Sequence, residues 1–361
     1  MLLLVLLLLR TEKKMPELKK NKKNVIAITG ANGFVGSHVV KYLIENTKFS
    51  IRACVRDPSN KTKIEHLEEL GGDRIQFYAS SLDKEGSYDE AFEGADAVIH
   101  TAARVHESWS DALLESHIQG TTNVVKAAKK SSTVQRFVQT SSIAAIIDPY
   151  HEKANDPSFI FDESNYNSTT DPKVNGDYYG YAKCVAEKIA VDAGNDDATN
   201  FDTVVINPSV VIGECLCKAH TKASPVFIRQ MLYGNEQPLI YFSWVDAEDV
   251  AKAHHDVLFK KNVSGERFII TNEFEGSVVD VARNFQTVHK ALNNVRTTPS
   301  WKIYLQYFFM TDYEWKMLNS KLPVTNKKAK SVLGFQSFVT MEESLRKTIN
   351  SMIEKKYIKL R

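Results

Sequence analysis

A glycine-rich turn between an apolar strand and an amphipathic helix is the feature that most restricts how this chain can fold. The run Val25–Thr29 is apolar and β-branched, and it leads directly into a GxxGxxG motif. Glycines at such a position let the backbone turn sharply and approach a pyrophosphate, while the following helix N-terminus offers free N–H groups. The motif therefore predicts a dinucleotide site. Its expected cofactor contacts are Gly30, Asn32, Gly33, Phe34, Val35 and Gly36.

Short apolar strands alternate with helical stretches through the first half of the chain. This alternation predicts an α/β fold with a doubly wound parallel sheet, a Rossmann fold, covered by helices on both faces. After the first strand and helix, we expect strands at 51–55, 75–78, 97–100, 136–140 and 203–206, and helices at 64–70, 88–92, 118–130 and 179–193.

The alternation also suggests how the chain divides. We expect residues 1–24 to be a disordered extension and residues 25–212, with part of 240–258, to form the nucleotide-binding domain. Residues 213–361 alternate less regularly and are expected to form mainly a smaller, C-terminal substrate-binding domain.

Charge and the N-terminus restrict the partners of this chain. The formal net charge is +2, but seven basic and only two acidic residues lie between Arg10 and Lys23. The remainder holds 39 basic and 42 acidic residues, which gives no support for nucleic-acid binding. The apolar run Leu2–Leu9 is too short to span a membrane, which takes about 20 residues. We expect a cytoplasmic protein, with attachment through a short N-terminal signal anchor as the alternative.

Cysteine usage argues against disulfides and against a metal site. Cys54, Cys184, Cys215 and Cys217 do not make a disulfide framework in a chain of 361 residues, and a reducing compartment fits them. The chain has no CxxC pair and no HExxH motif, so neither structural zinc nor a zincin centre is expected. The CxC at 215–217 is interpreted as a pair of loop thiols.

The residues after the second strand bear on the choice of cofactor. An acidic residue there accepts a hydrogen bond from the ribose of NAD, whereas arginine binds the 2′-phosphate of NADP. Arg56 follows the strand directly and Lys63 lies seven residues further on. Asp57 is the competing candidate, but its place before Pro58 suits a turn. The pattern favours NADP(H) over NAD(H).

Tyr179 and Lys183 form a YxxxK pair near the start of a predicted helix, where this spacing places both side chains on one face. A phenol has a pKa of about 10, and an ammonium group one turn away lowers it by favouring the phenolate. Ser141 and Ser142 end another predicted strand, at the sheet edge where ligands bind. Taken singly, the YxxxK pair also fits aromatic residues at the surface or in the core, and the serines also fit a capping role. Their order on one chain favours catalysis.

Together these motifs resemble the extended short-chain dehydrogenase/reductase superfamily, which includes the epimerases and dehydratases. Within it, the chain is most similar to the dihydroflavonol reductase and cinnamoyl-CoA reductase group, from about Val25 to near the C-terminus. The segments that carry the likeness are Gly30–Gly36, 56–58, 140–142, 178–183, 207–209, 244–254 and 326–335.

The resemblance implies roles for individual residues. Tyr179 would donate a proton to a carbonyl, Lys183 would lower its pKa and bind the ribose, and Ser142 would polarise the substrate oxygen. Arg56 and Lys63 would bind the 2′-phosphate. Two positions depart from the family, which often has Asp-Leu where this chain has Ser81-Leu82, and Asn at His117. The remaining implied cofactor contacts are Ser81, Leu82, Thr101, Ala102, Ala103, Ser141, Pro208, Ser209, Val210, Val211 and Ser224.

We therefore expect an NADPH-dependent reductase acting on the carbonyl of a small organic aldehyde or ketone. One alternative is an NAD-dependent 3β-hydroxysteroid dehydrogenase or nucleotide-sugar epimerase/dehydratase on the same scaffold. Another is a non-catalytic regulator that binds NADP(H). The segment from Asp148 to Asp177 and the residues beyond Gly213 are expected to line the substrate pocket.

Overall fold

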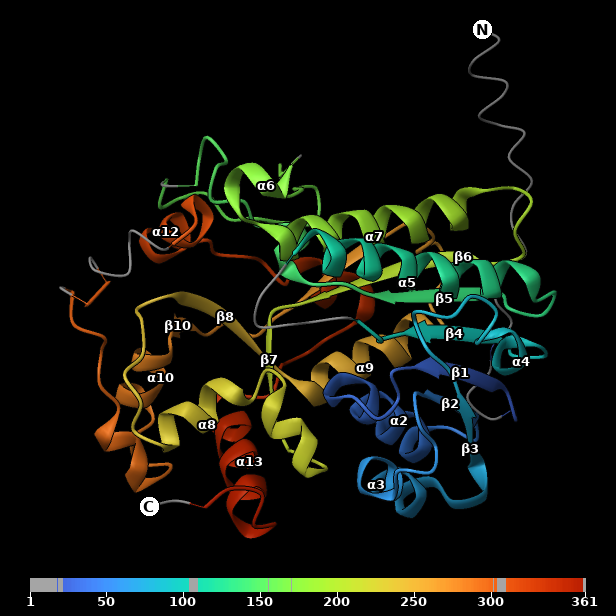
Figure 1. The fold of residues 1–361 in the computed structure, drawn as a ribbon, viewed down its shortest axis with the longest axis horizontal. Coiled ribbons are helices and arrows are strands. Elements are labelled where there is room, and N and C mark those ends of the chain that lie inside the picture. The colour runs from blue at the N-terminus through green and yellow to red at the C-terminus, as the bar shows by residue number, and fades with distance from the viewer. Residues whose placement is uncertain are drawn as a thin grey trace, which may run out of the picture.

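Seven parallel strands form a central sheet in the order β3-β2-β1-β4-β5-β6-β9 (Figure 1). The order reverses between β1 and β4, which is where doubly wound sheets bind ligands at their carboxyl edge. The strands are β1 (Val25–Thr29), β2 (Ser50–Val55), β3 (Ile75–Ala79), β4 (Ala97–His100), β5 (Arg136–Thr140), β6 (Asp202–Pro208) and β9 (Arg267–Ile270).

Helices cover both faces of this sheet, because its strands are apolar on both sides (Figure 1). In β1, Ile26 and Ile28 belong to the core beneath α2 and α9, whereas Ala27 faces the core beneath α5 and α7. The helices of the first face are α2 (Phe34–Asn46), α3 (Lys61–Gly71), with η1 (Gly72–Arg74), and α9 (Ala247–Val257). Those of the second are α4 (Asp89–Phe92), α5 (Asp111–Lys130) and α7 (Tyr178–Asn195).

A second, three-stranded sheet lies beyond the carboxyl edge in the order β10-β8-β7. Trp244 is fully buried at its centre and donates from Nε1 to the Gly276 carbonyl oxygen at 2.9 Å. Around it lie β7 (Val210–Ile212), η3 (Lys218–Lys222), α8 (Val226–Leu232), β8 (Tyr241–Asp246), β10 (Glu275–Ser277), α10 (Val278–Asn284), η4 (Lys290–Asn294) and α13 (Met341–Glu354). The remaining elements are η2 (Ile143–Ala145), α6 (Pro172–Asn175), α12 (Asp312–Asn319) and η5 (Ala329–Leu333).

This computed structural model describes residues 18, 22–103, 110–154, 156–169, 171–300, 302–303 and 310–359. The extension expected at 1–24, with its Leu2–Leu9 run, lies outside them apart from Leu18 and residues 22–24. No helix within these ranges is long and apolar enough to cross a bilayer.

The predicted doubly wound α/β sheet is confirmed, and the predicted strands lie within two residues of the observed ones. The helix that differs most from its predicted bounds is α5. It begins at Asp111 rather than at residue 118, because Ser110 caps it by accepting from the Leu113 N–H at 3.3 Å.

A buried carboxyl on α9 gives the fold a pH dependence. Asp249 accepts a hydrogen bond from the Val339 N–H at 2.8 Å. Burial raises the pKa of this carboxyl to about 7, and the neighbouring Asp246 and Glu248 act in the same direction, against the Val339 N–H and Lys347. The folded protein therefore keeps a proton that the unfolded chain loses at much lower pH.

We predict that the contribution of Asp249 to the free energy of unfolding falls as pH rises from about 4 to about 7, by at most roughly 1.4 kcal/mol per pH unit. Asp249→Asn removes this contribution, so the free energy of unfolding of the variant minus that of the wild type should rise with pH over this range, measured by urea unfolding at several pH values. The exposed neighbour Glu248 supplies the control, since Glu248→Gln should leave the slope in place. An unchanged slope in Asp249→Asn would contradict the assignment.

Candidate active site

The glycine turn packs directly against the end of β4. Gly30 has a φ of +66°, and a Cβ there would lie 2.8 Å from the Ala102 Cα. A Cβ on Gly36 would lie 2.8 Å from the Thr101 Oγ1. Only glycine fits both positions, so the turn and the Thr101–Ala103 segment lie side by side at the sheet edge.

The same turn leaves the N-terminus of α2 available to an anion. Gly33 occupies the N-cap position without a side-chain hydrogen bond, and the first turn contains no acidic residue. The first N–H groups of a helix have no partner within it, and the helix dipole favours negative charge there. A cradle free of side chains, next to these N–H groups, fits a dinucleotide pyrophosphate.

The candidates for the 2′-phosphate follow β2. Arg56 directly follows this strand and Lys63 lies in the first turn of α3, and both are exposed. Asp57 is engaged locally, because its Oδ1 accepts from the Ser59 N–H at 3.0 Å and from the Ser59 hydroxyl at 2.6 Å. These bonds lower the pKa of the Asp57 carboxyl and use it within the turn. Beyond β3, Leu82 packs against Gly120 of α5.

Helix α7 carries the tyrosine and the lysine. Its N-cap is Asp177, whose Oδ1 accepts from the Gly180 N–H at 2.9 Å and whose Oδ2 accepts from the Asn167 amide at 2.6 Å. Lys183 is buried, and its Nζ lies 5.7 Å from the centre of the Tyr179 ring. The two side chains therefore share one face of the helix.

The first turn of α7 packs against η2, the short helix that follows β5. A Cβ on Gly180 would lie 2.9 Å from the Ala144 carbonyl oxygen, and the Cys184 thiol donates to the Ala145 carbonyl oxygen at 3.5 Å. Ser142 caps η2, since its Oγ accepts from the Ala144 N–H at 3.1 Å. This contact brings the segments of Ser142, Tyr179 and Lys183 together at the end of β5.

A buried network holds α7 and η2 in place from behind. The Glu187 carboxylate pairs with the Arg267 guanidinium at 2.9 Å, and both side chains are 5% exposed. Asn207 donates from its amide to Glu187 and to the Ser142 carbonyl oxygen, the latter at 3.1 Å. Burial raises the pKa of Glu187, while the Arg267 charge opposes this.

Sequence reasoning missed Glu187 and Arg267. Glu187 lies one turn beyond Lys183 on the same helix, and this spacing was a usable signal. Nothing local marks Arg267, which reaches the site only because β9 pairs with β6.

The other predicted contacts lie at several places around the edge. Pro208 ends β6, and the Ser209 N–H donates to the Ile270 carbonyl oxygen at 3.1 Å. Ser224 precedes α8, beside Ala223, which packs against the core beneath α2. His117 is buried on α5. Burial lowers the pKa of His100 to about 3, and Lys183 and His117 act in the same direction.

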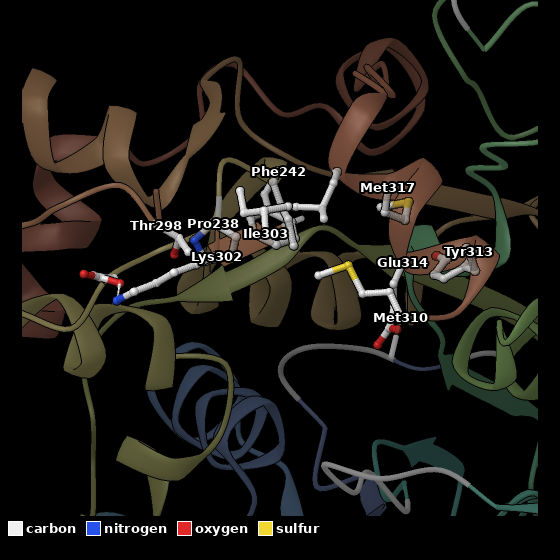
Figure 2. A pocket seen from close by; sticks show the side chains of 12 residues that line it. Pro238, Phe242, Thr298, Lys302, Ile303, Met310, Tyr313, Glu314 and Met317 are labelled. Atoms are coloured by element: carbon white, nitrogen blue, oxygen red, sulfur yellow. Dashed lines mark hydrogen bonds and ion pairs between the residues drawn. The ribbon is translucent and has the colours of Figure 1, made fainter. Parts of the chain in front are cut away.

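A largely apolar pocket of about 640 Å³ opens between β8 and α12 (Figure 2). At one end Lys302 pairs with Glu236 at 2.7 Å, and at the other lie Met310, Tyr313 and Met317. Met317 also packs against the cluster that contains Ile143 of η2. Burial raises the pKa of Tyr313, and the charges of Asp177 and Asp148 act in the same direction. The pocket therefore adjoins the segment that carries Ser142.

The Glu187–Arg267 pair gives a stability prediction. Glu187→Ala leaves a buried guanidinium without its countercharge, so we expect a loss of about 3–5 kcal/mol in the free energy of unfolding by urea. The double variant Glu187→Leu/Arg267→Met should recover much of this loss. Asp192→Ala is the matched control, because it breaks the exposed Lys188–Asp192 pair on the same helix and should cost less than about 1 kcal/mol. Equal losses for the buried and exposed pairs would refute the network's role.

Three comparisons with known proteins agree with this architecture. Cinnamoyl-CoA reductase CAD2 of Medicago truncatula is 29% identical over 94% of this chain and 99% of its own length. Cinnamoyl-CoA reductase 1 of Petunia hybrida is 33% identical over 72% of this chain and 77% of its own. The solved structure of yeast methylglyoxal/isovaleraldehyde reductase Gre2 complexed with NADPH superposes with a TM-score of 0.74 at 24% identity. The superposition covers 92% of this chain and 100% of the Gre2 chain.

The family model described as the NAD dependent epimerase/dehydratase family matches residues 26–271, from the first strand through the last strand of the large sheet. This match spans the glycine turn, Ser142, the tyrosine–lysine pair and Arg267. The chain belongs to the NAD dependent epimerase/dehydratase family, in its group of dihydroflavonol reductase-like and cinnamoyl-CoA reductase-like proteins.

Proposed function

We propose that this protein is an NADPH-dependent carbonyl reductase that acts on small, largely apolar aldehydes or ketones. The observation that carries the proposal is the contact between the first turn of α7 and η2. It gathers Ser142, Tyr179 and Lys183 beside the carboxyl edge of the large sheet, where the glycine turn also lies. Relatives named as cinnamoyl-CoA reductases and as the ketoreductase azaE of Aspergillus niger support a reductase.

Residues that follow β1 and β2, at the carboxyl edge of the large sheet, would hold the cofactor. Gly30, Gly33 and Gly36 leave room for the pyrophosphate at the N-terminus of α2, and Arg56 and Lys63 offer positive charge to a 2′-phosphate. The engagement of the Asp57 carboxylate with Ser59 favours NADP(H) over NAD(H). The NADPH-bound Gre2 neighbour supports the same choice. When bound, NADPH supplies the hydride.

Ser142 and Tyr179 would act on the substrate oxygen, and Lys183 would act on Tyr179. The Ser142 Oγ accepts from the Ala144 N–H, which leaves its own O–H to donate to a carbonyl oxygen. Tyr179 gives its phenolic proton to that oxygen as negative charge develops there. Lys183 stabilises the phenolate that remains, because its ammonium group lies on the same face of α7.

The pocket between β8 and α12 supports an apolar substrate. Its wall is largely hydrocarbon and thioether, which favours an alkyl or aryl body over a sugar nucleotide. We place the cofactor on the large sheet, and the substrate between that sheet and the C-terminal elements around β8. All four cysteines are free, which suits a reducing, cytoplasmic location.

Tyr179→Phe tests the proton donor. We expect turnover of NADPH with a panel of aldehydes and ketones to fall by about 10²–10⁴-fold, because a phenylalanine ring has no hydroxyl proton to give. NADPH affinity, measured by fluorescence titration, should stay within a few-fold. Tyr178→Phe is the matched control, since the neighbouring hydroxyl faces Asp111 at an exposed position, and it should keep full activity. Full activity in Tyr179→Phe would rule out the mechanism.

Arg56→Ala tests the cofactor assignment. Removing the guanidinium should raise the Michaelis constant for NADPH by tenfold or more, estimated from one charged hydrogen bond at about 1.5–3 kcal/mol, and leave that for NADH nearly unchanged. Lys61→Ala is the control, because this nearby lysine already pairs with Glu68. Equal effects on both cofactors would favour NAD(H) and an epimerase- or dehydrogenase-type enzyme.

A further inference from the structure

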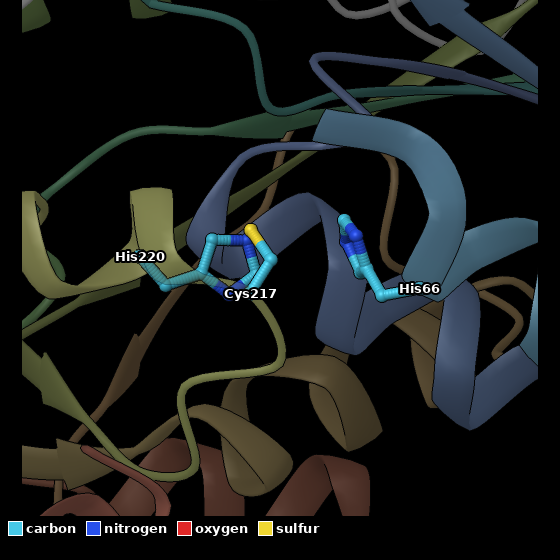
Figure 3. Close-up of side chains that lie close together, drawn as sticks. All are labelled: His66, Cys217 and His220. Carbon is cyan, nitrogen blue, oxygen red and sulfur yellow. The ribbon is translucent and has the colours of Figure 1, made fainter. Parts of the chain in front are cut away.

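A cluster of two histidines and a cysteine lies beside α2 (Figure 3). His66 comes from α3, whereas Cys217 immediately precedes η3 and His220 lies within it. One nitrogen of each imidazole and the Cys217 sulfur all lie within 4.8 Å of one another. Ligands of a single zinc ion lie roughly 3.3–3.8 Å apart, so a shift of about 1 Å would close the site.

The hydrogen bonds around His66 leave one ring nitrogen for a ligand. We assign the Ser37 hydroxyl as the donor to the Ala31 carbonyl oxygen at 3.0 Å, and its Oγ as the acceptor from the His66 Nε2–H at 2.9 Å. The His66 Nδ1 then carries a lone pair. It is buried and has no hydrogen-bond partner. A buried nitrogen lone pair without a proton donor is an unmet interaction that a cation satisfies.

His220 has a similar arrangement. Its Nε2 lies 3.4 Å from the Asn32 carbonyl oxygen, which suits an N–H donor, and its Nδ1 accepts from the Leu216 N–H at 3.2 Å. A metal ion bound at this Nδ1 would replace the Leu216 N–H as its partner. Metal-binding histidines commonly donate their second N–H to a carbonyl oxygen, as the Asn32 contact would provide.

Cys217 supplies the sulfur of the cluster. It occupies the N-cap position of η3, and the His220 N–H donates to the Cys217 carbonyl oxygen at 3.1 Å, so the backbone holds the thiol and the His220 ring within one turn. The thiolate is the form of cysteine that binds metal ions.

We propose that His66, Cys217 and His220 bind one Zn²⁺ ion, through two imidazole nitrogens and a thiolate. Nitrogen and sulfur ligands of this kind select zinc over magnesium or calcium. The ion would join the segment after β7 to α2 and α3, directly behind the glycine turn, because His220 contacts Asn32 and His66 contacts Ser37. Its role is structural, since the tyrosine and lysine lie on another part of the edge. Binding releases the Cys217 proton to solvent.

Titration of the full chain with Zn²⁺, in competition with a chromophoric chelator, tests this proposal. We expect one Zn²⁺ per chain, and an affinity that falls by tenfold or more in Cys217→Ser and in His66→Ala. Cys215→Ser is the matched control from the same CxC motif. Its sulfur lies outside the cluster, so its Zn²⁺ affinity should be unchanged.

Co²⁺ provides a second readout, on the wild-type chain itself. A thiolate-to-Co²⁺ charge-transfer absorption should appear in the wild type and in Cys215→Ser and be absent in Cys217→Ser. Failure of the wild type to bind Zn²⁺, equal affinity in all variants, or absence of the Co²⁺ band would each overturn the proposal. The wild-type readouts stand even where a variant fails to fold. None depends on carbonyl reduction, so the outcome is independent of the proposed enzyme activity.

Discussion

The ion pair between Glu187 and Arg267 connects the parts of this molecule that must stay in register. It lies where α7, β6 and β9 meet, and through Asn207 it reaches the backbone of Ser142. Arg267 also donates to the carbonyl oxygens of Asn165 and Ala145, so the guanidinium satisfies several segments at once. Burying two charges this deeply carries a large desolvation free energy, which only a well-oriented ion pair with further hydrogen bonds offsets. The start of α7 therefore has one favourable position relative to η2.

A second constraint lies at the glycine turn, where the absence of side chains lets the backbone pack directly against the segment after β4. Gly30 and Gly36 allow α2 to start against the end of β4, so the helix N-terminus points along the edge where the strands stop. The segment after β7 covers the opposite side of this turn through His220. The turn is thus held from two directions, by the large sheet and by a loop that belongs to the later part of the chain.

Much of the large sheet was predictable because its information is local. Each strand is a short apolar run, and each covering helix repeats its apolar residues at helical spacing, so neither needs knowledge of distant contacts. The YxxxK pair was visible for the same reason. The start of α5 was missed because a cap depends on one polar side chain rather than on a repeating pattern. Arg267 was missed because its partners lie far away in the sequence.

The order of motifs in the sequence determined the fold class, the nucleotide turn and the tyrosine–lysine face, since backbone freedom at glycine and helical periodicity act within a few residues. Only the tertiary structure decided which distant groups meet. It placed Arg267 against Glu187, and His66 beside Cys217 and His220. It also placed Met317 against the apolar cluster that contains Ile143 of η2. Such contacts arise from strand order and from packing after β7, where burial energy depends on shape rather than on sequence spacing.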